Sequence, residues 1–268
     1  MPIRGWLQRI GGEHVQVSVL IRSGQSMHTF DPVPRLMTEI DACGVFFTLG
    51  LPFERRMIER LESRSKPPRV VDLRTGVELR EIDVPCVHET DDPEHKHEHA
   101  SGGDKDPHIW LNPRIAAQIC STIGQTLIDI DPAHRDEYAK NLAALQSELL
   151  GAHESLRERL APLRGSSMLV YHPDFGYFCD EYGLRQMPLE LEGREPTARE
   201  ISVLTEKAKS LSVRAVFTQT QYSRKSADAL ASRIGATVVV VDPLAEEYAA
   251  TLAQIADGLL AHAPTSQP

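Results

Sequence analysis

Apolar residues along the chain form short runs that alternate with longer segments of helical spacing. The short runs are rich in β-branched and aromatic residues and predict six strands: Val15–Ile21, Gly44–Leu49, Arg69–Leu73, Ser166–Tyr171, Arg214–Gln219 and Ala236–Asp242. Continuous runs such as TVVVV are typical of strands buried on both faces of a parallel sheet. The pattern therefore predicts an α/β fold of mostly parallel sheets flanked by helices.

Several helix starts are marked by capping residues. Asn112 and Asp131 each precede a proline, which places a capping side chain before a first helical residue that needs no amide proton. Thr197 and Glu200 have the spacing of a capping box, in which each side chain bonds the backbone of the other residue. These signals predict helices beginning at residues 113, 132 and 198.

The longest periodic segment runs from Pro132 to Ala161. Its apolar residues follow helical spacing without an internal proline: Tyr138, Leu142, Leu145, Leu149, Leu156 and Leu160. A helix of this length spans roughly 40 Å. We interpret it as a strut between two α/β lobes, residues 1–131 and 162–268, with the helix itself at 132–161. An ordinary long helix within a single domain is the alternative.

Composition narrows the class of protein. The 268 residues carry a net charge of −9, which argues against nucleic-acid binding because no basic stripe offsets it. No apolar run approaches the roughly 18–20 residues of a membrane span. The four cysteines are widely spaced and are expected to be isolated thiols, with one long-range disulfide as the alternative. No signal peptide is visible, which indicates either a cytoplasmic protein or a natural start upstream of Met1.

Four polar residues occupy similar places relative to the predicted strands and helices. His172 and Asp242 directly follow strands, and each precedes a proline. His28 lies in the loop after Val15–Ile21, and His108 lies just before the capped start at Asn112. Loops at the carboxyl ends of parallel strands form the ligand crevice of α/β folds, so these side chains are candidates for one site.

The chemistry of this residue set suits zinc. Three neutral imidazoles and one carboxylate make a closed tetrahedral set, and imidazole favours zinc over magnesium or calcium. Four protein ligands leave no position for an activated water, so the expected role is to hold the metal and not to catalyse a reaction. Taken singly, each residue is as well explained as a surface, capping or turn residue.

Five phrases in a fixed order carry a family resemblance: SGQSMHTFDPVP, DPHIWLNP, YHPDFGYF, ELEGREPTARE and VVVVDPL. Together they resemble the zinc/manganese solute-binding proteins of bacterial ABC transporters, the ZnuA and TroA type, over nearly the whole chain. The resemblance implies two α/β lobes joined by one long helix, with the metal in the cleft between them. It also implies ligands at His28 and His108 from the first lobe and at His172 and Asp242 from the second.

The resemblance further implies a function. We expect capture of Zn²⁺ and its delivery to a membrane ABC permease, by a monomer located in the periplasm or tethered to the cell surface. Mn²⁺ or Fe²⁺ is the alternative cargo, but a third nitrogen donor at His172 favours zinc over manganese. The family has an additional strand and a secretion signal before the segment matching Pro2–Gly12, so we expect the natural start to lie upstream. A first lobe that lacks this edge of its sheet is the alternative.

An acidic, histidine-rich loop at residues 88–106 precedes His108. Its histidines His95, His97 and His99 lie among acids, glycine and lysine without apolar periodicity. We expect them to bind zinc weakly, as an auxiliary site, and a solvated spacer without a role is the alternative. A zinc hydrolase is a further alternative for the whole protein, but no H-E-x-x-H motif supports an enzyme.

Overall fold

The computed structural model describes residues 1–21, 24–25, 30, 34–83, 105–190, 196–222 and 224–263. The chain divides into two compact units, each assembled from separate segments. The first unit comprises Met1–Glu78, Asn112–His153 and Leu244–Tyr248. The second comprises Leu79–Leu111, Glu154–Pro243 and Ala249–Pro268. The sequence pattern instead predicted lobes made of consecutive residues, with lobe boundaries after residues 131 and 161. Those boundaries stay a prediction.

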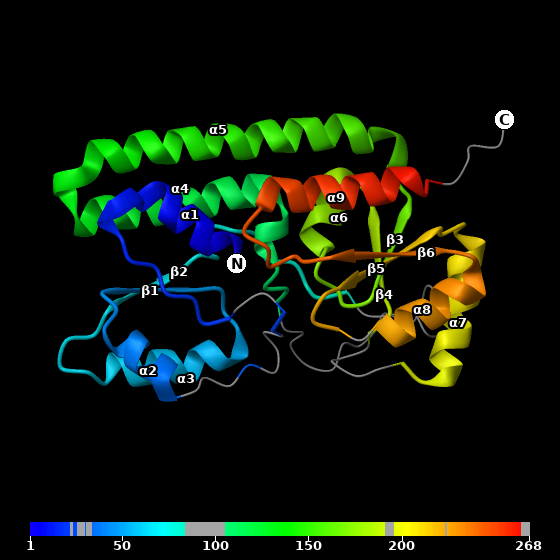
Figure 1. Cartoon of the computed structure of the whole chain (residues 1–268), viewed down its shortest axis with the longest axis horizontal. Helices are drawn as coiled ribbons and strands as arrows, with labels where there is room; N and C mark the ends of the chain where they lie inside the picture. The colour runs from blue at the N-terminus through cyan, green and yellow to red at the C-terminus, as the bar shows by residue number, and fades with distance from the viewer. Residues whose placement is uncertain are drawn as a thin grey trace. The chain divides into compact units, whose positions relative to one another are not determined.

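The first unit contains a two-stranded parallel sheet. Strands β1 (Val45–Thr48) and β2 (Arg69–Asp72) pair in register from Val45 opposite Arg69 to Thr48 opposite Asp72. Helices α2 (Pro34–Asp41) and α3 (Pro52–Glu62) lie on one side of these strands, and α1 (Pro2–Gly11) and α4 (Pro113–Ile130) lie together on the other (Figure 1). Buried side chains from α2, β1 and α3 form a small core: Ile40, Phe46, Met57 and Leu61.

The segment Val15–Ile21 was predicted to be a strand, and this prediction is wrong. The segment has no strand pairing. Its side chains instead line a cavity of about 560 Å³ together with residues of α1, β1 and α4. The β-branched residues of this run favour an extended segment, but they cannot supply the pairing partner that a strand requires.

The second unit contains a four-stranded sheet in the order β4-β3-β5-β6, with all three pairings parallel. Strands β3 (Ser167–Val170), β5 (Ala215–Gln219) and β6 (Thr237–Val241) confirm three predicted runs. The edge strand β4 (Arg185–Pro188) has the sequence RQMP and was not predicted. Its polar residues and terminal proline are tolerated because an edge strand pairs on one side only.

Helices cover both faces of this sheet because successive strand residues point to opposite sides. Val216 and Val238 pack with α7 (Ala198–Ser210) and α8 (Arg224–Ile234) in one core. Phe217 and Val239 face Gly258 of α9 (Tyr248–Ala261) on the other side. The short helix α6 (Gly176–Tyr182) packs beside β4. Figure 1 shows α7 and α8 side by side, and α6 and α9 on the opposite face of the sheet.

The long helix is confirmed. Helix α5 runs from Arg135 to Leu160, with short 3₁₀ turns at Pro132–His134 and Ala161–Leu163. Its residues up to His153 pack with the first unit and the following ones with the second. The mixed α/β class, with parallel sheets flanked by helices, is likewise confirmed.

Two of the three predicted caps are confirmed. Asn112 Oδ1 accepts from the amides of Arg114 and Ile115, at 2.9 and 3.3 Å. Thr197 and Glu200 form the predicted capping box. Asp131 does not cap; its carboxylate accepts from the Tyr138 hydroxyl and contacts His134 Nδ1, both at 2.7 Å.

Two further predictions concern the thiols and the membrane. Cys43, Cys120 and Cys179 are free thiols, as expected, and Cys86 lies outside the described residues. Within the described part of the chain, no helix combines the length and the apolar character needed to cross a membrane.

Candidate metal centre

The carboxyl edge of the four-stranded sheet gathers polar side chains from several strand ends. His172 lies two residues beyond β3, Glu190 two residues beyond β4, and Gln219 is the last residue of β5. His108 comes from the segment before the 3₁₀ turn Ile109–Leu111 and is also part of the second unit. All carboxyl ends of a parallel sheet meet at one edge, which is why residues so distant in sequence can approach one another there.

His108 is buried and held from its Nδ1 side by a carboxylate. Its Nδ1 lies 2.7 Å from Asp106 Oδ1, and the same oxygen accepts from the His108 backbone amide at 2.9 Å. The other carboxylate oxygen of Asp106 accepts from Arg80 Nη1 at 3.2 Å. The backbone carbonyl of Asp106 accepts from the Tyr177 hydroxyl at 2.9 Å. The motif Asp-Pro-His therefore places a fully buried carboxylate directly against the imidazole that follows it.

His172 has the same kind of support from a more distant residue. Its Nδ1 lies 2.6 Å from Glu190 Oε2, and both side chains are buried. The Glu190 backbone amide donates to the Tyr171 carbonyl at 2.8 Å, which fixes the segment after β4 beside the end of β3. The ring of Tyr222 stacks on the imidazole with centroids 5.1 Å apart. Both the plane and the rotation of the His172 ring are thereby constrained.

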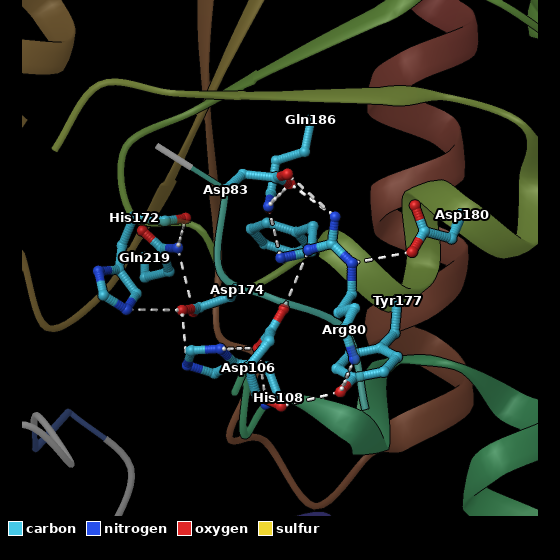
Figure 2. A network of polar contacts seen from close by, with 11 residues as sticks. Arg80, Asp83, Asp106, His108, His172, Asp174, Tyr177, Asp180, Gln186 and Gln219 are labelled. Atoms are coloured by element: carbon cyan, nitrogen blue, oxygen red, sulfur yellow. Dashed lines mark hydrogen bonds and ion pairs between the residues drawn. The ribbon is translucent and has the colours of Figure 1, made fainter. Parts of the chain in front are cut away.

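These contacts leave the Nε2 atoms of both imidazoles directed at a common point. A carboxylate beside Nδ1 favours the tautomer with the proton on Nδ1, so the Nε2 lone pair remains available for a metal. The two rings lie 5.5 Å apart at 81°, and Asp174 Oδ1 lies 3.2 Å from each Nε2 (Figure 2). Among the described residues, the grouping of His108, His172 and Asp174 places three potential metal-binding atoms within 4.8 Å of one another.

Arg80 forms ion pairs with three carboxylates, one of which is the Asp106 carboxylate that contacts His108. Its guanidinium bonds Asp106, both oxygens of Asp83 at 3.0 Å, and Asp180 Oδ2 at 2.8 Å (Figure 2). Asp83 also accepts from Gln186 Nε2 at 2.7 Å, while Gln186 Oε1 accepts from the backbone amide of Phe175. The network thus connects the support of His108 with the turn that carries Asp174.

The electrostatic environment of His108 favours a positive charge. Burial alone lowers the pKa of this imidazole, but the carboxylates of Asp174 and Asp106 oppose burial, and the net effect raises the pKa above its ordinary value. A bound cation can take the place of that proton between the same carboxylates. The donor set therefore fits a divalent metal ion of the kind that imidazole prefers.

Two of the four predicted ligands come together in the described residues. His108 and His172 lie with their Nε2 atoms 3.2 Å from the same oxygen of Asp174. Asp242 follows β6 and is half-buried, and it is not part of the closely spaced group. The backbone carbonyl of the next residue, Pro243, accepts from Trp110 Nε1 at 3.0 Å. This bond connects the end of β6 with the segment that carries His108. His28 and the auxiliary histidines His95, His97 and His99 lie outside the described residues.

Sequence reasoning did not identify the carboxylates that complete this arrangement. Asp106 and Asp174 each lie two residues from a predicted ligand, and that spacing was an available signal. Glu190 begins the acidic sequence ELEGRE, which is equally well explained as a solvated loop. Gln219 carried no local signal, because its partners lie far away in sequence. Arg80 has one local partner, Asp83, but its bond to Asp106 spans 26 residues.

Comparisons with known proteins identify the family of the chain. A family model described as ZnuA, zinc-uptake complex component A, periplasmic, matches residues 1–260. The high-affinity zinc uptake system protein ZnuA of Bacillus subtilis is 28% identical over 246 residues, which cover 91% of this chain and 76% of that protein. A crystal structure of ZnuA matches with a TM-score of 0.87 and 33% identity, covering 98% of this chain and 96% of that one.

A longer relative shows the same similarity over part of its length. The zinc-binding protein AdcA of Streptococcus pyogenes is 24% identical over 251 residues, which cover 91% of this chain but only 49% of that protein. The chain therefore spans about three quarters of the Bacillus subtilis relative and about half of the streptococcal one.

Proposed function

This chain belongs to the family of periplasmic zinc-uptake component A proteins, and we propose that it captures Zn²⁺ and delivers it to a membrane ABC permease. The supporting observation is the pair of buried imidazoles whose Nδ1 atoms are each held by a carboxylate and whose Nε2 atoms face a common point. Carboxylate–histidine pairs of this kind orient metal ligands and increase their basicity. The role is transport and not catalysis.

The proposed ligands are His28, His108, His172 and Asp242. His108 and His172 supply Nε2 donors from the second unit, and the carboxylate of Asp242 comes from the end of β6 in the same unit. His28 is proposed on its family position alone. His95, His97 and His99 are proposed as weaker, auxiliary zinc ligands.

The cellular setting follows from the family. We place the protein outside the cytoplasm, in the periplasm or tethered to the cell surface, because the family is periplasmic and a relative in Streptococcus pneumoniae is a zinc-binding lipoprotein. It acts as a monomer that meets its permease at the membrane surface.

Zinc titration against a competing chelator tests the proposal. Wild-type protein should bind one Zn²⁺ tightly, and His28→Ala, His108→Ala and His172→Ala should each weaken binding by more than the roughly 10–100-fold cost of changing a supporting residue. Deletion of residues 91–104 should remove only weaker binding. Tight binding that survives both His108→Ala and His172→Ala would place the metal elsewhere and contradict the proposed site.

A further inference from the structure

Asp174 occupies an unusual position for a carboxylate near two imidazoles. It is 2% exposed and lies between His172 and helix α6. The carboxylates of Asp106 and Glu190 lie against the Nδ1 atoms of His108 and His172, on the side of each ring that faces away from the other imidazole's Nε2. Asp174 Oδ1 lies on the opposite side, 3.2 Å from both Nε2 atoms (Figure 2). Its oxygen therefore faces the point where a metal would bind.

The second oxygen of Asp174 is fixed by Gln219. The Gln219 side chain is fully buried, and its Nε2 donates to Asp174 Oδ2 and to the His172 carbonyl, both at 3.0 Å. The backbone amide of Asp174 also donates to the His172 carbonyl, at 2.8 Å. These bonds hold Asp174 against the His172 turn and leave Oδ1, and not Oδ2, directed at the imidazoles.

The separations match those of ligands that share one cation. Two donors bound at about 2.1 Å in a tetrahedral set lie about 3.4 Å apart. The distance from Oδ1 to each Nε2 is 3.2 Å, so the carboxylate needs little movement to share a cation with the two imidazoles. Burial of an anion is costly unless a positive charge lies beside it, and a divalent cation at this point would supply that charge while both imidazoles stay neutral.

We propose that Asp174 is a ligand of the transported cation and a determinant of metal preference. The inference rests on the proposed function. Asp174 adds a carboxylate oxygen to the proposed ligand set, one donor more than a closed tetrahedral zinc site uses. The additional oxygen favours higher coordination numbers and the harder cations that prefer carboxylates, manganese above all. Asp174 thus broadens a nitrogen-rich zinc site towards Mn²⁺.

Two variants separate a ligand from a structural residue. Asp174→Asn keeps nearly the same shape, because its amide oxygen can accept from Gln219 while its NH₂ group faces the imidazoles. Asp174→Ala removes the group entirely. Asp228→Asn is the matched control, since this carboxylate lies on the surface of α8 and pairs with Arg224. Thermal unfolding of the metal-free proteins verifies folding, and Asp174→Asn decides the question if Asp174→Ala does not fold.

Two measurements on the full chain test the inference. Competition titrations should show that both Asp174 variants lose at least about tenfold more affinity for Mn²⁺ than for Zn²⁺. The visible absorption of bound Co²⁺ should become stronger in the variants, because four-coordinate Co²⁺ absorbs more intensely than Co²⁺ of higher coordination. The control should match the wild type in both measurements.

Three outcomes are distinct. Equal losses of Mn²⁺ and Zn²⁺ affinity with an unchanged Co²⁺ spectrum would overturn the role of Asp174 while leaving the proposed function intact. Unchanged affinities for both metals would overturn it as well. Failure of the wild-type protein to bind any of the three metals would contradict the proposed function, and this inference with it.

Discussion

The two units of this protein differ in how completely their sheets are packed. The second unit has four strands covered on both faces, and Phe217 at its centre is fully buried against Gly258 of α9. The described residues of the first unit form two strands, and a cavity of about 560 Å³ lies beside β1 and the unpaired segment Val15–Ile21. The better-packed unit is the one that carries the paired imidazoles. A close-packed frame can hold ligand side chains to the small tolerances that metal binding requires.

The units also differ in how they accommodate a buried carboxylate. In the first unit, Glu54 accepts from the backbone amides of Leu49 at 3.0 Å and Leu51 at 2.8 Å, and burial raises the pKa of its carboxyl to about 7. In the second unit, Asp106 is bonded by a guanidinium and lies against an imidazole. The first carboxylate supports a helix start, whereas the second orients a ligand.

The packing difference predicts the largest effect on stability. Phe217→Ala should lower the free energy of unfolding by about 3–5 kcal/mol, because it opens a cavity in a close-packed core. Phe46→Ala should lower the free energy of unfolding by a smaller amount, since Phe46 already borders the cavity of the first unit. Urea unfolding of both variants measures this, with Asp228→Asn as a surface control. Equal losses for the two phenylalanines would show that the units are packed alike.

The Glu54 carboxyl predicts a pH-dependent stability in the first unit. The pKa of Glu54 in the folded protein is raised to about 7. Its stabilising contribution to the free energy of unfolding is therefore fully present below the pKa of the unfolded chain, and it is lost as pH rises through the pKa of the folded protein. The wild-type free energy of unfolding should therefore fall between about pH 4.5 and pH 7, by on the order of 3 kcal/mol. Glu54→Gln should remove this slope. A variant with the same slope as the wild type would assign the effect to another group.

The support behind the imidazoles predicts a specific loss of metal affinity. Asp106→Asn and Glu190→Gln should each weaken zinc binding by about 10–100-fold, because each variant removes the carboxylate that orients an imidazole and sets its tautomer. Asp129→Asn is the control from the first unit, where the carboxylate forms an exposed ion pair with Arg69. Competition titration distinguishes the variants. Wild-type affinity in Asp106→Asn would show that His108 needs no carboxylate partner.

The raised pKa of His108 predicts opposite pH trends for binding and for metal-free stability. Zinc competes with the proton on Nε2, so affinity should fall about tenfold per pH unit for each proton displaced once pH drops below the folded pKa. The stabilising contribution of the same group to the metal-free protein is present at low pH and lost as pH rises through that pKa. Titrations and thermal melts between pH 5 and pH 8 would show both, and a flat zinc affinity would contradict histidine ligation.

Local sequence signals predicted the frame of the site better than its detailed chemistry. The β-branched runs located β3, β5 and β6, and the cap at Asn112 located the helix after His108. The same reasoning failed for Val15–Ile21, because a strand depends on a partner that its own residues do not specify. It missed β4, whose RQMP sequence has few of the residues typical of strands.

The supporting residues could not be predicted for a related reason. His172 and Glu190 are 18 residues apart, and Gln219 donates to a carbonyl 47 residues away. Such contacts depend on the order of strands in the sheet, which no short motif encodes. Asp106 and Asp174 are exceptions, because each lies two residues from a histidine that the sequence had already identified.

Zinc-edge anomalous diffraction from crystals of the zinc-loaded chain tests the central claim most directly. We predict one strong peak about 2.0–2.2 Å from the Nε2 atoms of both His108 and His172, with Asp106 and Glu190 still against the Nδ1 atoms. A tightly bound zinc ion that contacts neither imidazole, or that contacts them through Nδ1, would contradict the account.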